Sequence, residues 1–194
     1  MSAAYRIEGY AIVSADGHIA DRDHYMPDLL KNDEDQRFLG AALDRADLLV
    51  HGRHSHEGHA HEGHEGAERR RRLIVTRRVP AIAPNSDFPN AISWNPAGAT
   101  FEAACAAHGL HSGGVAILGG TEVYGLFLDI GYERFHLSRS RFVLLPGGLP
   151  VFGRERDGGS AEQALRRAGL EPGPEQTLDQ ACGVSIVEWR RKTA

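Results

Sequence analysis

The segment VAILGGTEVYGLFL, from Val115 to Leu128, joins an apolar run, two adjacent glycines and a helical apolar spacing. The first four residues predict a buried strand, and the apolar residues after Gly120 recur at the spacing of a helix that Thr121 is expected to cap. Glycines permit close approach of a ligand, and the first N–H groups of a helix attract anions. The turn can therefore hold a nucleotide phosphate, although similar turns also serve only to reverse the chain.

Two other predicted strands end in residues that bind anions. In LLVHGRHS an arginine and a serine follow the strand, and in LIVT a threonine and arginines do so. A guanidinium forms paired hydrogen bonds with phosphate, and hydroxyl groups can add to the same site. Ligands of parallel α/β sheets gather at the carboxyl ends of the strands, so we expect one shared anion site rather than three solvated strand ends. Its residues would be Gly52, Arg53, His54, Ser55, Thr76 and Arg77.

A histidine-rich stretch, HEGHAHEGHEG, occupies about residues 56–66. Neutral imidazoles bind zinc, nickel or copper, but this spacing lacks the fixed geometry of a His-Glu-x-x-His helix. A solvated loop without a physiological metal is the interpretation we adopt. The non-enzyme alternative is a metal-carrying or metal-sensing module. Its ligands would be His56, His59, His61 and His64.

The elements that must position these residues alternate between strand and helix. Apolar patterning predicts strands at 5–15, 47–51, 73–76, 92–94, 115–118 and 183–189. Helices are predicted at 33–44, from about residue 55, and at 100–108, 121–128 and 160–170, with Asn32 or Asp33 capping the first. This alternation predicts a parallel α/β core, and the last strand, at an edge or in a hairpin, makes the sheet mixed. We expect one domain over residues 1–194.

Composition narrows the class of protein. The 194 residues are 41% hydrophobic, enough for a sizeable core, and a formal net charge of −4 gives no electrostatic footprint for nucleic acid. Cys105 and Cys182 are far apart, which argues against a disulfide framework or a thiolate zinc site. Secretory and membrane-spanning patterns are not seen, so we expect a cytoplasmic protein without a membrane partner.

Six segments follow one another along the chain: AIVSADGHIA, ADLLVHGRHS, RRLIVTRR, VAILGGTEVYGLFL, FHLSRSRF and CGVSIVEWRRK. In this order they resemble the dihydrofolate reductase superfamily, which includes the riboflavin-pathway reductases. The resemblance covers nearly the whole chain. It implies a three-layer α/β/α sandwich with a mixed, mainly parallel sheet, and NADPH lying across the strand ends.

The resemblance also assigns the cofactor contacts. The first anion-binding segment would hold the pyrophosphate and adenosine-phosphate side, and Thr76 and Arg77 would face the 2′-phosphate. The glycine turn and the start of its helix would line the pyrophosphate and the nicotinamide ribose. Glu122 departs from members that carry a cation there, and a carboxylate near phosphate is unfavourable. The residues of this third group are Gly119, Gly120, Thr121 and Glu122, with Tyr124 nearby.

In this family a hydride passes from the nicotinamide to a C=N or carbonyl carbon, and a carboxylate often binds the heterocycle. Glu34 stands four residues before Phe38, and Asp35 stands three residues before it. Either acid can therefore be the carboxylate that binds the heterocycle. Asp28 would require a different loop path. We choose Asp35, with Phe38 and Asp28 as further substrate-binding candidates and Ser138 as a hydroxyl bonded to the carboxylate. First-turn acids that only complement the helix dipole are the alternative.

The substrate class stays open at this point. A pterin is one possibility, and a 5-amino-6-ribosylamino-pyrimidine, as in the riboflavin-pathway reductases, is the alternative that the SADGHIA loop favours. A homodimer would also fit the riboflavin-type members.

Overall fold

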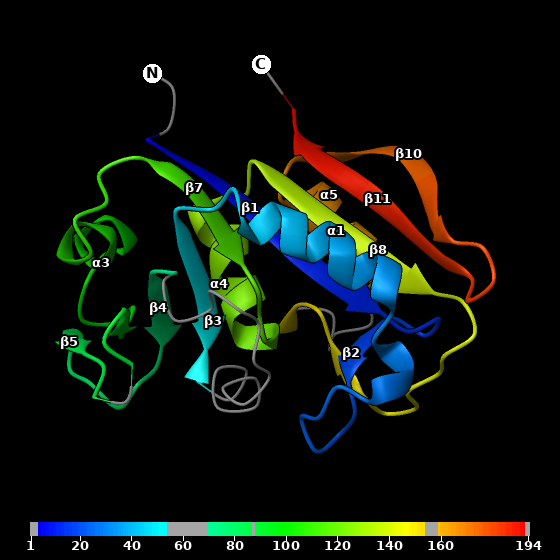
Figure 1. Ribbon diagram of the computed structural model, residues 1–194, viewed down its shortest axis with the longest axis horizontal. Helices are drawn as coiled ribbons and strands as arrows, with labels where there is room; N and C mark the ends of the chain where they lie inside the picture. Colours follow the sequence, from blue (N-terminus) through cyan, green and yellow to red (C-terminus); the bar gives the residue numbers. More distant parts are fainter. Residues whose placement is uncertain (1–3, 54–69, 87, 154–158, 193–194) are drawn as a thin grey trace.

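The computed structural model describes residues 4–53, 70–86, 88–153 and 159–192. Most of the strands form one nine-stranded sheet in the order β10-β11-β8-β1-β7-β3-β4-β6-β5 (Figure 1). The strands are β1 (Tyr5–Val13), β2 (His18–Ala20), β3 (Leu48–Gly52), β4 (Arg72–Val75), β5 (Ile82–Pro84), β6 (Ala91–Trp94), β7 (Gly113–Ile117), β8 (Arg134–Ser140), β9 (Leu149–Pro150), β10 (Leu170–Asp179) and β11 (Val184–Arg191). The helices are the 3-10 helix η1 (Asp28–Leu30) and the α-helices α1 (Asp33–Leu43), α3 (Phe101–Ala107), α4 (Thr121–Ile130) and α5 (Ala161–Arg167).

The centre of the sheet is parallel. Strand β1 pairs in parallel with β7 and β8, β3 pairs in parallel with β7 and β4, and β4 pairs in parallel with β6. Strands β5, β11 and β10 join in antiparallel orientation, and β2 pairs with β9 in a separate small sheet. Because the parallel strands share one direction, the ends of β3, β4 and β7 reach the same edge of the sheet.

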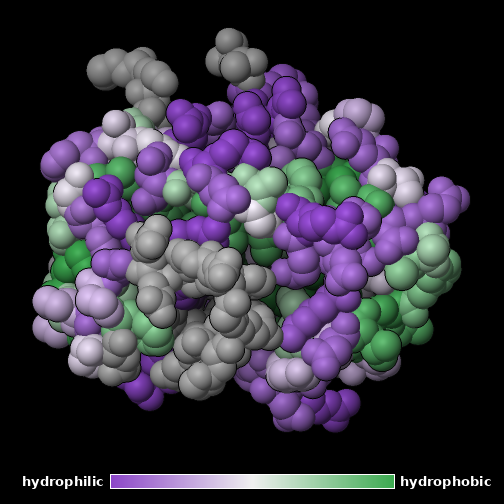
Figure 2. All heavy atoms as spheres, viewed as in Figure 1, coloured by the Kyte–Doolittle hydropathy of each residue, from purple (hydrophilic) through white to green (hydrophobic). Residues whose placement is uncertain are grey.

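Helices cover both faces of the sheet, which confirms the predicted α/β/α sandwich. Helix α1 packs Ala42, with Phe38 partly buried, against Tyr10, Leu49 and Ala116. The larger core lies on the opposite face, where residues of α3, α4 and α5 meet those of the central strands. Figure 1 shows α1 in front of the sheet with α4 and α5 behind it, and hydrophilic residues predominate on the α1 side of the surface (Figure 2).

Local sequence explains the start of α1. The Asn32 side chain accepts hydrogen bonds from the backbone N–H groups of Glu34 and Asp35, at 3.1 and 3.2 Å, which satisfies two N–H groups that lack helical partners. The amide of Asn32 also donates to Asp179 at the end of β10, at 2.9 Å. The cap thus fixes the first turn of α1 against the β10–β11 hairpin.

One prediction about the ends of the elements was wrong. Thr121 does not cap α4: the cap position is Gly120, and Thr121 is the first helical residue. The closing strand β11 forms a hairpin with β10, which is one of the two arrangements predicted for it, and β10 takes the sheet edge. The prolines of β10 hid that strand from pattern reading. The helix expected from about residue 55 and the histidine-rich stretch lie outside the described residues. None of the described helices is long and apolar enough to span a membrane.

Candidate active site

The glycine turn after β7 lies directly against the end of β3. The backbone N–H of Gly52 donates to the carbonyl of Gly119 at 2.6 Å, and the N–H of Leu118 donates to the carbonyl of Val50 at 2.8 Å. A Cβ atom on Gly52 would lie 3.6 Å from the Gly120 nitrogen. The structure therefore brings together two of the three segments that the sequence assigned to an anion site.

A side chain at position 119 would clash with its surroundings. Its φ is +95°, and a Cβ atom there would lie 2.6 Å from the Tyr124 ring. The peptide bond between Gly119 and Gly120 is cis. Gly119 is buried and Gly120 is partly buried, so the missing Cβ atom at position 119 makes room for the Tyr124 ring at the start of α4.

At the start of α4, one side chain is hydrogen-bonded to a neighbouring strand and the next is exposed to solvent. The hydroxyl of Thr121 donates to the carbonyl of Pro150 in β9 at 2.6 Å, which links α4 to the small β2–β9 sheet. Glu122 is exposed, whereas Tyr124 is buried in the core. Thr121 is therefore occupied by a structural hydrogen bond, and Glu122 is the side chain of this turn that faces solvent.

The third segment, after β4, reaches the same edge. Gly52 in β3 is paired with Val75 in β4, and Thr76 follows with its N–H bonded to the Trp94 carbonyl at 2.9 Å. The Thr76 hydroxyl accepts a hydrogen bond from the Arg78 N–H at 3.2 Å, and the Arg77 side chain is exposed. Arg53, directly after β3, is partly buried. His54 and Ser55 lie outside the described residues.

Asp35 is the buried acid of the first helix. Only 8% of this residue is exposed, and burial raises the pKa of its carboxyl group, while a hydrogen bond with Ser138 opposes that rise. Ser138 lies in β8 and is itself buried. The structure therefore places this hydroxyl beside the carboxyl group, and the substrate-binding role of the pair stays a prediction.

The other two acids face solvent. Glu34 forms an ion pair with Arg37 at 2.9 Å on the surface of α1. Asp28 has a side chain that is 82% exposed and pairs with Lys31 at 3.2 Å. Of the three acids that the sequence offered, Asp35 alone combines burial with a hydroxyl partner.

Tyr124 connects the glycine turn to the region around Asp35. Burial, with a smaller contribution from the Asp35 charge, raises the pKa of the Tyr124 hydroxyl. That hydroxyl donates to the backbone carbonyl of Tyr10 in β1. The side chain predicted to lie near the nicotinamide thus lies near the acid predicted to bind the heterocycle.

Sequence analysis missed a group of polar and aromatic residues beside Phe38. The Phe38 ring lies 5.3 Å from the His136 ring and 6.4 Å from the Tyr10 ring. The rings of Tyr10 and His136 stack at 4.8 Å with an interplanar angle of 9°. The strand period of two was the available signal, because it places Tyr10 and Glu8, and likewise His136 and Ser138, on one face.

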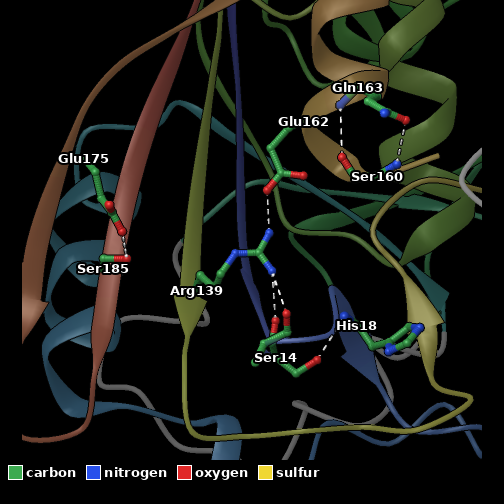
Figure 3. Close-up of polar contacts among 9 residues, drawn as sticks. Ser14, His18, Arg139, Ser160, Glu162, Gln163, Glu175 and Ser185 are labelled. Atoms are coloured by element: carbon green, nitrogen blue, oxygen red, sulfur yellow. Dashed lines mark hydrogen bonds and ion pairs between the residues drawn. The ribbon is translucent and has the colours of Figure 1, made fainter.

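A cleft of about 460 Å³ lies elsewhere, beside the loop after β1. Arg139 lines it and follows Ser138 in β8, so the two side chains point to opposite faces of the sheet. Figure 3 shows the Arg139 guanidinium held between Glu162 in α5 and the backbone carbonyl of Ser14, which it contacts at 3.2 Å. His18 also lines this cleft, with its Nδ1 atom 3.4 Å from the Asp16 carboxylate. These contacts fasten the loop to α5.

The metal alternative concerns residues outside the described part of the chain. Within residues 4–53, 70–86, 88–153 and 159–192, His, Cys, Asp and Glu do not form a group of three able to hold a metal ion. His56, His59, His61 and His64 all lie in the range that is not described, so the hypothesis that they bind a metal stays a prediction.

Comparison with known proteins identifies the fold. Neither a protein-family model nor a curated protein sequence matches the chain. Solved structures do match. A putative riboflavin biosynthesis protein from Shewanella sp. PV-4 is 19% identical, with a TM-score of 0.67 over 97% of this chain and 99% of that one. Dihydrofolate reductase from Enterococcus faecalis, complexed with NADP(H), is 14% identical, with a TM-score of 0.65 over 96% of each chain.

A third similar structure is the diaminohydroxyphosphoribosylaminopyrimidine deaminase/5-amino-6-(5-phosphoribosylamino)uracil reductase of Thermotoga maritima. It is 15% identical, with a TM-score of 0.64 over 96% of this chain. Our chain spans only 56% of that protein's length. At these identities the similarity establishes the architecture, which agrees with the sheet order and helix placement described above. The chain therefore has the same fold as these solved structures.

Proposed function

We propose that the protein is an NADPH-dependent reductase that transfers a hydride to a pterin or a related heterocycle. The observation that carries this proposal is the buried pair of Asp35 and Ser138, placed near Tyr124 behind the glycine turn. A carboxylate with a hydroxyl partner suits the N–H groups of a heterocyclic ring. The turn offers backbone to a cofactor, and the similar structures include a reductase complexed with NADP(H).

The cofactor half of the site draws on three strand ends. The start of α4, after Gly120, would offer backbone N–H groups to the cofactor phosphates, and Arg53 would supply a cation for them. Arg77, exposed after β4, would contact the 2′-phosphate and favour NADPH over NADH. The cofactor supplies the hydride, and the residues of the chain orient it against the substrate.

The substrate half rests on Asp35. An ionised carboxylate in a buried position can accept two parallel N–H bonds from the ring, and Ser138 fixes its orientation. Phe38, three residues further along α1, supplies an apolar ring on the same side of the helix. This arrangement orients the heterocycle; a proton is still needed from solvent or from a group in the loop after β1.

Reduction of a ribosylamino-pyrimidine is the second candidate function. It is favoured by the similarity to a putative riboflavin biosynthesis protein and to a phosphoribosylaminouracil reductase. Both candidate reactions use the same cofactor site, and their substrates differ in the group that is attached to the heterocyclic ring. A direct comparison of dihydrofolate with a ribosylamino-pyrimidine as oxidant of NADPH would separate them.

The first test is a titration of metal-free protein with NADPH and NADH. Trp94 is a suitable reporter, because it is buried at the end of β6 and its carbonyl bonds the N–H of Thr76. We expect micromolar NADPH affinity, weaker NADH affinity, and at least tenfold weaker NADPH binding in Arg53→Ala, from loss of charge-assisted hydrogen bonds.

Arg141→Ala is the matched control. Arg141 follows β8, on the other side of the central strands from β3, and forms an exposed ion pair with Glu175 at 2.9 Å. Its loss should leave NADPH affinity unchanged. If wild-type protein binds neither nicotinamide cofactor, the reductase proposal fails, and metal binding by the histidine-rich stretch becomes the next hypothesis to measure.

A further inference from the structure

A polar cluster lies under α1, one step along the strands from the Asp35–Ser138 pair. It consists of Glu8 and Tyr10 on β1 and His136 on β8. The Tyr10 hydroxyl donates to the Glu8 carboxylate at 2.5 Å, and the Nε2 atom of His136 lies 3.7 Å from the same carboxylate. His136 is 8% exposed and Tyr10 is 9% exposed. Glu8 is partly buried, with 23% of its side chain exposed, and its carboxylate accepts the hydrogen bond of the buried Tyr10 hydroxyl, so the cluster has a defined geometry.

The cluster touches the proposed site through two contacts. Its rings meet Phe38, which lies on the same face of α1 as Asp35. The backbone carbonyl of Tyr10 accepts the hydrogen bond of Tyr124. A displacement of the Tyr10 or His136 ring would therefore alter the apolar wall of the substrate site, and a shift of the Tyr10 backbone would alter the position of Tyr124.

We propose that His136 is a positioning residue for the heterocycle: its ring, stacked on Tyr10 and oriented by Glu8, fixes Phe38 and the first turns of α1 in the arrangement that binds substrate. The inference rests on the proposed function, and it assigns His136 no contact with substrate or cofactor. It deepens that function by naming what sets substrate affinity independently of cofactor affinity.

The geometry indicates that the His136 ring positions the substrate site and does not contribute to fold stability alone. His136 is followed in β8 by Leu137, whose side chain points into the core on the opposite face, and then by Ser138, which bonds Asp35. His136 and Ser138 thus stand side by side beneath Phe38 and Asp35. Phe38 of α1 lies over His136 of β8, and Asp35 of α1 lies over Ser138. A displacement of Phe38 and His136 would therefore also displace Asp35 and Ser138.

The experiment compares His136→Ala with His136→Phe. Phenylalanine keeps an aromatic ring for the stack and for Phe38, but it loses the contact with Glu8; alanine loses both. We would measure the Kd of NADPH, and then the Kd of 2,4-diaminopyrimidine at saturating NADPH. This probe carries the paired N–H groups that complement a carboxylate. Aromatic pairs contribute enough to make His136→Ala bind the probe about tenfold more weakly, with His136→Phe within about threefold of wild type.

NADPH affinity should stay within about twofold in both variants, which a general loss of structure would not allow. Leu137→Val is the control for stability, because it weakens packing in the same strand but on the other face. Its probe affinity should match that of wild type even if its Tm falls.

The outcomes separate the two proposals. If wild type binds NADPH and the probe, and His136→Ala binds the probe equally well, the positioning role is wrong and the proposed function stands. The positioning role is also wrong if Leu137→Val weakens probe binding as much as His136→Ala does. If wild type binds NADPH but not the probe, the Asp35 substrate site and the role of His136 both fall. If NADPH does not bind either, the reductase proposal falls with them.

Discussion

The carboxylate of Asp35 and the hydroxyl of Ser138 meet between α1 and β8, where both residues are buried. Burial raises the pKa of the carboxyl group and the hydrogen bond lowers it, with burial the larger effect. The two residues come from elements about a hundred positions apart, so their contact depends on the docking of α1 onto the sheet. The ionisation of Asp35 is thus adjustable through Ser138.

Replacing Ser138 with alanine should raise the pKa of Asp35 further, because the hydrogen bond stabilises the ionised form. Substrate binding that requires the ionised carboxylate should then appear only at higher pH than in wild type. The measurement is the pH dependence of kcat/KM, or of 2,4-diaminopyrimidine binding.

Ser138→Thr serves as the control for that shift, since threonine keeps the hydroxyl and should keep the wild-type profile. A Ser138→Ala profile that coincides with the wild-type profile, or moves to lower pH, would show that Asp35 does not govern binding.

Gly119→Ala should weaken NADPH binding by at least tenfold, since a Cβ atom there would lie 2.6 Å from the Tyr124 ring at a φ of +95°. Gly125→Ala, in the middle of α4, is the matched control, because its Cβ atom would meet only the Gly153 nitrogen, at 3.8 Å. Alanine within a helix is more stable than glycine by about 0.5–1 kcal/mol, so this variant should bind NADPH normally and unfold at a slightly higher temperature. Fluorescence titration and thermal unfolding of both variants test the pair. Equal NADPH affinity in Gly119→Ala would exclude the turn from the cofactor site.

Patterns local in sequence predicted much of the fold. The strand, glycine turn and helix at 113–130, and the Asn32 cap of α1, follow from side-chain spacing and turn chemistry within a few residues. Strand β10 did not, because Pro172, Gly173 and Pro174 interrupt a strand that is stabilised by its pairing with β11. Thr121 was misjudged for a similar reason: its hydrogen-bond partner, Pro150, lies far along the chain.

The substrate side of the candidate site was harder to predict than the cofactor side. The ends of strands can be recognised in the sequence, so Gly52 and Gly119 could be assigned in advance to the same edge of the sheet. The choice among Asp28, Glu34 and Asp35 depends on which acid the folded chain turns towards the sheet. Residues 28–35 hold four acids, Asp33 included, so the sequence leaves that choice open. Long-range burial distinguishes Asp35, and it also reveals the cluster of Tyr10 and His136.

Replacing Thr121 with valine should destabilise the protein by about 1 kcal/mol, because the Pro150 carbonyl would lose its hydrogen bond while the packing volume is kept. Pro150 is paired with His18 in the β2–β9 sheet, so the loss should loosen the link between that sheet and α4. Urea denaturation measures the change in the free energy of unfolding. Thr121→Ser keeps the hydroxyl and loses only the methyl group, so it should lose less stability. A Thr121→Val protein as stable as wild type would show that the hydrogen bond to Pro150 contributes nothing.

Acid should unfold the protein partly through Glu8. Hydrogen bonding with His136 is the largest influence that lowers the pKa of Glu8, from 4.5 to about 2, and the Tyr10 hydroxyl adds to it against the effect of burial. A carboxyl whose pKa is lower in the folded state stabilises the protein fully above its ordinary pKa. That stabilisation disappears as the pH falls from about 4.5 towards 2.

Glu8→Gln should therefore lower the free energy of unfolding by roughly 2–3 kcal/mol near neutral pH, and by progressively less below pH 4.5. Urea denaturation between pH 3 and 7 measures the difference between variant and wild type. Glu171→Gln is the control, because Glu171 forms an exposed ion pair with Lys192 at 3.1 Å, and such pairs contribute at most about 1 kcal/mol. A difference between wild type and Glu8→Gln that stays constant with pH would show that the charge of Glu8 is not what the cluster stabilises.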